Sequence, residues 1–299
     1  MGTTAIGLRC ASIGPRELAL AHQLCPCFDE VVFLLDPQAR PAAQALEDAQ
    51  RLGMVATIQP DCLIPSIGLP GDWAWRCGDL ALLALQAHLR NRGRAATHYW
   101  LIESDVGLHL DAEAFFDACA ARPEDLLAKH IRPASAHWRW HDTVAPFCVT
   151  PWRCDFPLLR ISDRALDACR TLRMTIHEQL QSLDRLAPND ESLVASCVIA
   201  QGYSVESLEH LFPEVFHYYS TVRAFPDTPH CRQQTDGSIV HSLLPMNDFI
   251  RKNFVAKLKH VQPPDHAAFL RHRIEALGPL LNPEETEHIV SALILGGHL

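Results

Sequence analysis

Two kinds of hydrophobic pattern alternate over the first sixty positions of the chain. Short apolar runs rich in leucine and β-branched residues predict strands at 4–10, 29–37 and 54–60. Between these runs, apolar residues recur at helical spacing over 15–25 and 42–53. Strands that alternate with helices in this way are typical of a parallel α/β sheet with right-handed crossovers.

The same two patterns continue toward the C-terminus. They predict a helix over 76–93, a strand over 98–103, a helix over 111–121, a strand over 124–131, a strand that turns into a helix near Ser162, and a helix over 189–202. The segment 134–146 reads as a polar, aromatic loop, and the chain beyond Met246 is mostly helical. We therefore expect one α/β domain over residues 1–245 and a helical C-terminal extension over 246–299 that packs on it.

Composition narrows the functional classes. The chain has 299 residues, 48% of them hydrophobic and 20% charged, which is ordinary for a globular protein. Its net charge of −9 and the lack of a long basic run argue against nucleic acid as the main partner. No apolar stretch approaches the roughly 18 residues of a membrane span, so we expect none.

The cysteines and the N-terminus indicate a compartment. There are 11 cysteines, several of them in apolar surroundings, and no pair has the C-x-x-C spacing of a zinc or redox motif. The first twenty residues lack the basic and apolar regions of a secretory signal. This pattern is typical of a reducing environment, and we expect a cytoplasmic protein.

Two acids follow the strand over 98–103, in the sequence "HYWLIESDVG". Ligands of open α/β sheets bind beyond the carboxyl ends of the strands, which is where Glu103 and Asp105 stand. Hard carboxylate oxygens there suit Mg²⁺ or Mn²⁺. The alternative is a solvated strand end in which Asp105 binds nearby backbone amides. The spacing of the two acids alone leaves both interpretations open.

The order of strands, this acid-x-acid motif and a later acidic helix together resemble the GT-A class of glycosyltransferases over residues 3–245. The resemblance implies a three-layer α/β/α, Rossmann-like mixed sheet that binds a nucleotide-diphospho-sugar through a divalent metal, Mn²⁺ or Mg²⁺. The D-x-D motif of the class here reads Glu103-Ser104-Asp105. Asp105 would be the metal ligand, and Glu103 would contact the nucleotide or water.

Two further positions match the class. Inverting members carry an acid at a helix after the acceptor-side strand, and Asp190 and Glu191 stand there as the implied catalytic base. The alternative is structural: Asn189 or Asp190 is a good N-cap for that helix, and acids in its first turn complement its dipole. His241 matches a histidine that returns to the metal or the diphosphate, although it is one of 17 histidines and a packed or surface role is the alternative.

The resemblance also implies donor-binding positions. Arg9 ends the first strand, and Asp36 follows the second, where it could bind a nucleoside or simply begin an Asp-Pro turn. Arg76 could offset the charge of a diphosphate. Asp79 could bind a sugar hydroxyl or cap the N-terminus of its helix.

An acceptor site is predicted in the segment "HWRWHDTVAPF". Aromatic faces pack against the apolar faces of sugar rings, so Trp138 and Trp140, with the polar His141, fit the binding of a hydroxyl-bearing acceptor such as a glycan. Ordinary packing of this loop is the competing interpretation.

The sequence predicts a metal-dependent transfer of a sugar from a nucleotide-diphosphate donor to a hydroxyl acceptor. Two alternatives stay open: a non-catalytic GT-A-like scaffold, and a metal-dependent phosphohydrolase or nucleotidyltransferase that uses Glu103, Asp105 and Asp190. Against the second alternative, the chain has neither a G-x-x-x-x-G-K-[ST] phosphate loop nor an H-E-x-x-H motif.

Overall fold

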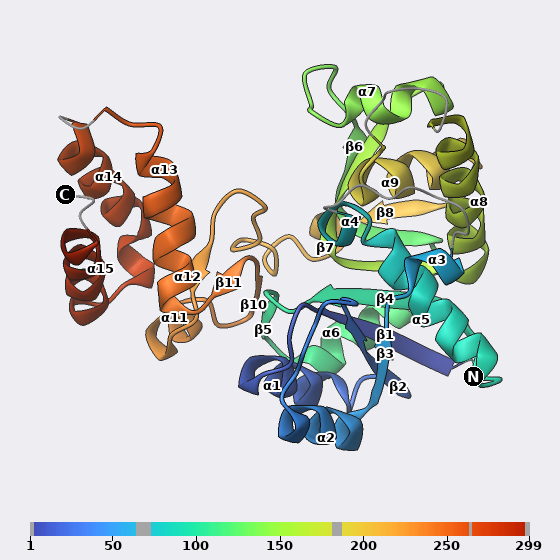
Figure 1. Cartoon of the computed structure of the whole chain (residues 1–299), viewed down its shortest axis with the longest axis horizontal. Coiled ribbons are helices and arrows are strands. Elements are labelled where there is room, and N and C mark those ends of the chain that lie inside the picture. The colour runs from blue at the N-terminus through green and yellow to red at the C-terminus, as the bar shows by residue number, and fades with distance from the viewer. Residues whose placement is uncertain (1–2, 64–72, 181–186, 263–264, 297–299) are drawn as a thin grey trace. The chain divides into compact units, whose positions relative to one another are not determined.

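The computed structural model describes residues 3–63, 73–180, 187–262 and 265–296. They form two compact units (Figure 1). Unit 1 comprises residues 1–104 and 112–213, and unit 2 comprises residues 105–111 and 214–299. Residues 214–245, which we assigned to the first domain, therefore pack in unit 2. Most of the turn-rich stretch between residues 61 and 72 lies outside the described residues.

Unit 1 is built on a seven-stranded sheet with the order β3-β2-β1-β4-β7-β6-β8. Its strands are β1 (Thr3–Cys10), β2 (Glu30–Leu35), β3 (Met54–Thr57), β4 (Ala96–Glu103), β6 (Leu126–Pro133), β7 (Trp152–Ser162) and β8 (Val205–Ser207). All run parallel except β7, which is antiparallel to both β4 and β6. The predicted mixed sheet is confirmed. Every residue of β2 is buried, as expected of a continuous apolar run inside a sheet.

Helices cover both faces of this sheet. They are α1 (Pro15–Leu24), α2 (Ala43–Leu52), α3 (Pro60–Leu63), α4 (Trp73–Arg76), α5 (Asp79–Asn91), α6 (Ala112–Ala120), α7 (His141–Val144), the 3-10 turn η1 (Ala145–Phe147), α8 (Asp163–Leu180), α9 (Asp190–Ala200) and α10 (Leu208–Leu211). The helices α5, α8 and α9 share one apolar core with the sheet, while α1, α2 and α6 lie on its other face (Figure 1). The predicted three-layer α/β/α fold class is thus confirmed.

Alternation along β4 shows how the sequence builds these layers. Tyr99 and Leu101 point into the core beneath α5. Trp100 points the other way and meets Phe116 of α6 edge-on, with 5.0 Å between the ring centroids. The predicted change from strand to helix near Ser162 is also confirmed, because its hydroxyl accepts a hydrogen bond from the N–H of Ala165 at the start of α8.

Unit 2 contains the helical appendage and several short strands. Its elements are β5 (Gly107–His109), β9 (Phe225–Pro226), α11 (Pro229–Gln234), β10 (Ser238–Val240), β11 (Leu243–Leu244), α12 (Met246–Ile250), the π-helical turn η2 (Arg251–Val255), α13 (Ala256–Leu258), α14 (His266–Leu277), the 3-10 turn η4 (Gly278–Leu280) and α15 (Pro283–Leu295). They surround a separate apolar core. The predicted helical tail is confirmed.

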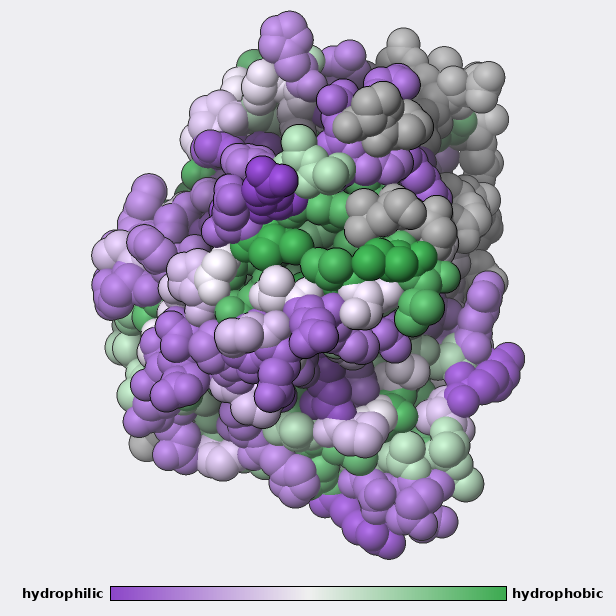
Figure 2. Space-filling model, turned by 90° about the vertical axis from the view of Figure 1, so that its left-hand side faces the viewer, coloured by the Kyte–Doolittle hydropathy of each residue, from purple (hydrophilic) through white to green (hydrophobic). Residues whose placement is uncertain are grey.

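Local signals define the last helix of unit 2. Asn282 caps α15 by accepting from the N–H of Glu285, and the Glu285 carboxylate accepts from the N–H of Asn282, which completes a capping box. Toward its other end, α15 exposes Ile294 (56%) and Leu295 (88%). Figure 2 shows hydrophobic residues gathered in a band, bordered by hydrophilic ones, on the face that it draws. Among the described residues, no helix combines the length and hydropathy needed to cross a bilayer.

Candidate functional site

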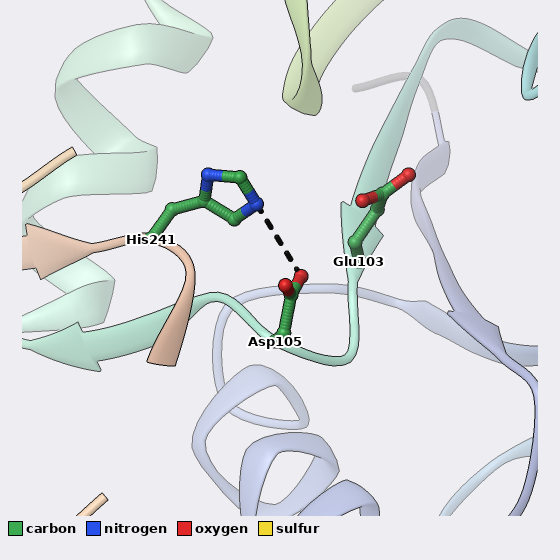
Figure 3. A group of neighbouring side chains, drawn as sticks. All are labelled: Glu103, Asp105 and His241. Atoms are coloured by element: carbon green, nitrogen blue, oxygen red, sulfur yellow. Dashed lines mark ion pairs between the residues drawn. The ribbon is translucent and has the colours of Figure 1, made fainter. Parts of the chain in front are cut away.

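Antiparallel pairing of two short strands brings Asp105 and His241 together in unit 2. Gly107 of β5 is opposite Val240 of β10, so the segment before β5, which contains Asp105, lies beside the segment after β10, which contains His241. The backbone agrees, because the N–H of Leu243 donates to the carbonyl of Asp105 at 2.7 Å. Figure 3 shows the imidazole of His241 directed at the Asp105 carboxylate, with 3.4 Å between Nε2 and Oδ1.

The Asp105 carboxylate is held in its charged form. Its burial raises the pKa, but the hydrogen bond and charge of His241 and the hydrogen bond from the Ser242 hydroxyl hold the pKa well below its usual range. His241 is 5% exposed, and its ring lies 5.0 Å from that of Tyr219. Its Nδ1 has no hydrogen-bond partner among the described residues. The pair therefore offers one carboxylate oxygen and one imidazole nitrogen side by side.

Gly107 allows β5 to lie this close to its neighbours. A Cβ at this position would be 2.6 Å from Cδ2 of Leu243 and 3.0 Å from Nε2 of His109. His109 is itself fixed through Nδ1, which lies 2.6 Å from the Thr235 hydroxyl. A side chain at 107 would require the side chains of Leu243 and His109 to move.

In unit 1, Arg9 and Glu103 lie at the ends of neighbouring parallel strands. They are register partners on β1 and β4, and Nη1 of Arg9 is 2.7 Å from Oε1 of Glu103. The two side chains are 14% and 28% exposed. The structure thus brings together two of the predicted donor-binding residues as an ion pair at the carboxyl edge of the sheet.

Asp190 lies in the first turn of α9 and is almost completely buried. Asn189 caps this helix, as the sequence suggested, by accepting from the N–H of Ser192. The Asp190 carboxylate is 4% exposed and accepts from the N–H groups of Gly78, at 2.7 Å, and Glu191, at 2.8 Å. Burial raises its pKa well above the usual value, although the charge of Arg9 opposes this shift.

Gly78 is required where α5 approaches this carboxylate. A Cβ at position 78 would be 2.6 Å from Oδ2 of Asp190, 2.7 Å from Nη1 of Arg9 and 2.7 Å from the ring of Phe156. The short contact between the Gly78 backbone and Asp190 therefore depends on the absence of a side chain. This glycine links α5 to the start of α9.

Glu191 is the acid with a pKa near neutrality. Burial and the charge of Asp155 raise its pKa to about 7, against the opposite effects of Arg153 and of a hydrogen bond from Asn189. A group that titrates near neutral pH can accept or release a proton under physiological conditions. The arrangement thus gives the two adjacent acids of α9 different properties: Asp190 is enclosed and Glu191 can exchange protons.

Sequence reasoning missed the polar cluster beside Glu191. Asp155 on β7 is 1% exposed, and its Oδ2 is 2.8 Å from Nδ1 of His130. His130 has a positive φ of 57°, and its N–H donates to the carboxylate of Glu209 at 2.8 Å. The available signal was the acid inside the otherwise apolar run "CDFPLL" of a core strand.

Asp79 and Asp36 have structural partners. The Asp79 carboxylate is 1% exposed and accepts two hydrogen bonds from Arg173, at 2.5 and 2.8 Å. An enclosed carboxylate that is engaged in this way does not fit the predicted contact with a sugar hydroxyl, so we leave Asp79 out of the site. Asp36 accepts from the N–H of Gln38 at 2.8 Å, which is the turn that the sequence offered as the alternative.

The predicted acceptor loop contains a short helix, α7, where we expected no regular element. Trp140, which precedes α7, is 3% exposed, and the guanidinium groups of Arg139 and Arg76 lie 4.2 and 5.2 Å from its ring centroid. A buried indole with these neighbours does not fit stacking on an acceptor sugar, and this correction follows from packing that the sequence pattern did not reveal. Arg76, which the resemblance assigned to the diphosphate, thus has its guanidinium group over the ring of Trp140.

The other two acceptor residues are more accessible. Trp138 is half-buried, and the guanidinium of Arg153 lies 4.9 Å from its ring centroid. Nδ1 of His141 is 2.7 Å from the carboxylate of Asp142. Through Arg153, Trp138 is connected to the polar cluster beside Glu191, because the charge of Arg153 acts on that carboxyl.

Comparison with known proteins finds no match by sequence and only distant matches among solved structures. No protein-family model matches the chain, and no curated protein matches it by sequence. Among solved structures, the chain is similar to glucosyl-3-phosphoglycerate synthase from Mycobacterium tuberculosis in complex with Mn²⁺, uridine diphosphate and phosphoglyceric acid. The identity is 12%, and the match covers 61% of this chain and 66% of that chain with a TM-score of 0.35.

A second structure of that synthase, in complex with uridine diphosphate, is 13% identical to this chain. The match covers 69% of each chain and has a TM-score of 0.37. A structure described as a mycobacterial protein is 12% identical, with 63% of each chain covered and a TM-score of 0.34. The matches thus span about two thirds of those proteins, and they say nothing of the activity or the site residues of this chain. The three-layer α/β/α architecture of unit 1 is seen in its own mixed, helix-covered sheet.

Proposed function

We propose that this protein is a metal-dependent glycosyltransferase that moves a sugar from a nucleotide-diphosphate donor to a hydroxyl acceptor. The observation that carries the proposal is the pairing of the Asp105 carboxylate with the His241 imidazole, at 3.4 Å. Asp105 is the last acid of an acid-x-acid motif that follows a core strand, and His241 follows a strand late in the chain. These are the two positions that the resemblance to the GT-A class assigns to the metal.

The donor atoms fit a divalent ion. Adjacent ligands of an octahedral ion with bonds of about 2.1 Å are about 3 Å apart, close to the 3.4 Å between Oδ1 of Asp105 and Nε2 of His241. A mixed set of carboxylate oxygen and imidazole nitrogen suits Mn²⁺ better than Mg²⁺, which prefers oxygen ligands. When bound, the ion would supply positive charge that neutralises the leaving diphosphate.

Ser242 orients the metal-binding carboxylate. Its hydroxyl donates to Oδ2 of Asp105, which leaves Oδ1 directed toward His241. Glu103 precedes Asp105 by two residues, so the covalent chain alone keeps their Cα atoms within about 7 Å. We assign Glu103, with its partner Arg9, to the nucleotide or to water bound beside it.

Glu191 is the better candidate for the base if the reaction inverts. A general base works best when its pKa lies near the operating pH, and the pKa of Glu191 is raised to about 7. Asp190 is enclosed, and its oxygens accept from two backbone N–H groups, so we assign it a positioning role.

A thermal-shift panel tests this proposal. UDP, GDP, CDP and their sugar derivatives would be added with and without Mn²⁺ to the wild type and to Asp105→Ala. A ligand that binds the native state at about a hundred times its dissociation constant stabilises it by roughly 2.7 kcal/mol. We expect a nucleotide-selective shift that requires Mn²⁺ and disappears in Asp105→Ala. No shift with any nucleotide, in a folded protein, would overturn the proposal.

Turnover separates the transferase from its alternatives. Release of nucleoside diphosphate with transfer of the sugar to an added hydroxyl acceptor supports the proposal. A Mn²⁺-dependent shift without turnover favours the non-catalytic scaffold. Release of inorganic phosphate or pyrophosphate instead favours the phosphohydrolase or nucleotidyltransferase.

A further inference from the structure

Unit 2 contains a cavity of about 380 Å³ that the proposed function does not use. It lies among α14, the π-helical turn η2, the 3-10 turn η4 and the segment before β9. Its volume falls within the range of small-molecule sites. Six of its lining residues carry polar groups: His217, Tyr218, Arg223, Asn253, His272 and Arg273.

The charged side chains that line this cavity are all basic. Two arginines and two histidines line the cavity, and no carboxylate is among its described lining residues. Burial and the charge of Arg223 lower the pKa of Arg273, so the two guanidinium groups are close enough to repel each other. Two like charges that share a partly buried cavity raise the free energy of the empty state, and an anion would relieve this repulsion.

Three acids of unit 2 have partners outside the cavity. Asp227 pairs with Arg232 at 2.7 Å, and Asp248 pairs with Arg251 at 2.9 Å. Glu285 accepts the N–H of Asn282 in the capping box of α15. None of these three carboxylates lines the cavity, so the lining itself keeps its positive charge.

Arg273 is held in place by Asn253. Its Nη2 donates to the carbonyl oxygen and to Oδ1 of Asn253, at 3.2 and 3.4 Å. Asn253 is 2% exposed and is fixed in turn by the backbone of Ala224, to which its Nδ2 donates at 3.0 Å. Nε of Arg273 is buried without a hydrogen-bond partner among the described residues. π-helical turns such as the one that presents Asn253 occur frequently at functional sites.

The rest of the lining is apolar. Phe225, Leu277 and Leu280 are buried, and the ring of Tyr218 meets that of Phe225 edge-on at 6.0 Å. An inorganic anion would leave this surface without a partner, whereas a ring or short hydrocarbon body would cover it. A guanidinium fork binds both carboxylate and phosphate oxygens.

We propose that this cavity of unit 2 binds a small organic oxyanion, a phosphate or carboxylate on an aromatic or short hydrocarbon body, between Arg223 and Arg273. The oxyanion contacts the two guanidinium groups, and the body lies against Phe225 and Leu277. None of the residues that line this cavity is assigned to the metal or the nucleotide.

Calorimetric titration of the full chain in EDTA tests the proposal apart from the proposed function. The probes are phenyl phosphate and benzoate, with benzyl alcohol, benzamidine and inorganic phosphate as comparisons. We expect at least one aromatic anion to bind, and to bind at least tenfold more tightly than the three comparison probes. Equal binding of benzyl alcohol, binding of inorganic phosphate as tight as that of phenyl phosphate, or no binding of either aromatic anion would overturn the proposal.

Variants locate the binding. Arg273→Gln and Arg223→Gln should each weaken binding of the aromatic anion about tenfold or more, and Arg223 is exposed, so its substitution does not disturb the core. Ala276→Trp, at an exposed lining position of α14, should block the cavity without a change in charge. Arg251→Gln, outside the cavity, is the matched control and should bind as the wild type does. Unchanged affinity in both Arg223→Gln and Ala276→Trp would refute the site.

Discussion

Arg173 and Asp79 form an ion pair that is completely enclosed in unit 1. The side chains are 0% and 1% exposed, and two hydrogen bonds join Nη2 to Oδ1 at 2.5 Å and Nε to Oδ2 at 2.8 Å. A third bond connects Nη1 of Arg173 to the carbonyl of Pro188, just before the cap of α9. The pair therefore joins α5, α8 and the segment that leads to Asp190 and Glu191.

Removal of one member of this pair should strongly destabilise the protein. Arg173→Met leaves the buried Asp79 without its partner, and we expect a loss of about 3–5 kcal/mol in the free energy of unfolding, measured in urea. The double variant Arg173→Met, Asp79→Leu should recover much of this loss, because neither charge is then left unpaired.

A half-exposed pair supplies the control. Arg90 lies 2.7 Å from Asp163 and 2.8 Å from Asp167, and these side chains are 35%, 34% and 45% exposed and therefore solvated, so Arg90→Met should cost only about 1 kcal/mol. Similar losses in Arg173→Met and Arg90→Met would contradict the importance that we give to the buried pair.

Glu191 should make the stability of the protein depend on pH. Its folded pKa of about 7 exceeds that of an unfolded glutamate, so the folded state binds more protons between these values. The free energy of unfolding should therefore fall as the pH rises from about 4.5 to about 7. In the wild type, we expect Glu191 to lower the free energy of unfolding by on the order of 1–2 kcal/mol between pH 5 and pH 8, measured by urea titrations. Glu191→Gln should abolish this decrease.

The exposed Glu287→Gln on α15 serves as the control and should keep the wild-type slope. If Glu191→Gln kept that slope too, the raised pKa would be wrong. Under the proposed function, the wild type should also gain activity as the pH rises through about 7, because the base must be deprotonated.

Gly78→Ala should destabilise unit 1 through steric overlap. The new Cβ would lie within 2.7 Å of atoms of Asp190, Arg9 and Phe156, and overpacking of this kind costs about 1–3 kcal/mol. Thermal unfolding of the variant would measure the effect. Gly278→Ala is the matched control, because no atom lies within 4 Å of its Cβ position. We expect Gly278→Ala to be near neutral, and an equal loss in both variants would refute the close approach at Gly78.

His241 should determine which ion binds. Under the proposed metal site, His241→Ala removes the nitrogen ligand, and we expect Mn²⁺ affinity, measured by electron paramagnetic resonance, to fall about tenfold or more. His241→Asp supplies an oxygen ligand instead and should shift the preference toward Mg²⁺. The exposed His288→Ala should leave both affinities unchanged. Retention of Mn²⁺ affinity in His241→Ala would remove this histidine from the site.

The sequence predicted those helices and strands whose formation depends on residues close together in the chain. Strands such as β2, with its continuous apolar run, and helices such as α15, with its capping box, are specified locally, and the mixed sheet followed from the resemblance to the GT-A class. The roles of Asp79 and Trp140 depend on distant partners. Asp79 is buried against Arg173, 94 residues later, and the positions of such partners cannot be read from hydrophobic periodicity.

The different environments of Asp190 and Glu191 also depend on residues that are distant in the sequence. The sequence placed Asp190 and Glu191 together at the start of a helix but gave no means to tell them apart. Their environments differ because Gly78 approaches one and Asp155 the other, and both contacts come from other elements of unit 1. The pairing of Asp105 with His241 likewise requires the register of β5 with β10.

The discontinuity of unit 2 bears on the order in which the protein folds during synthesis. The chain makes β5 and Asp105 early, but Ser242, which binds that carboxylate, is 137 residues further on. On the ribosome, β5 emerges before its partner strand and before the rest of unit 1 is complete, so unit 2 can close only after β10 and Ser242 have been synthesised. A fragment that starts at Glu214 would lack both this strand and the carboxylate that faces His241, and should not be expected to reproduce unit 2.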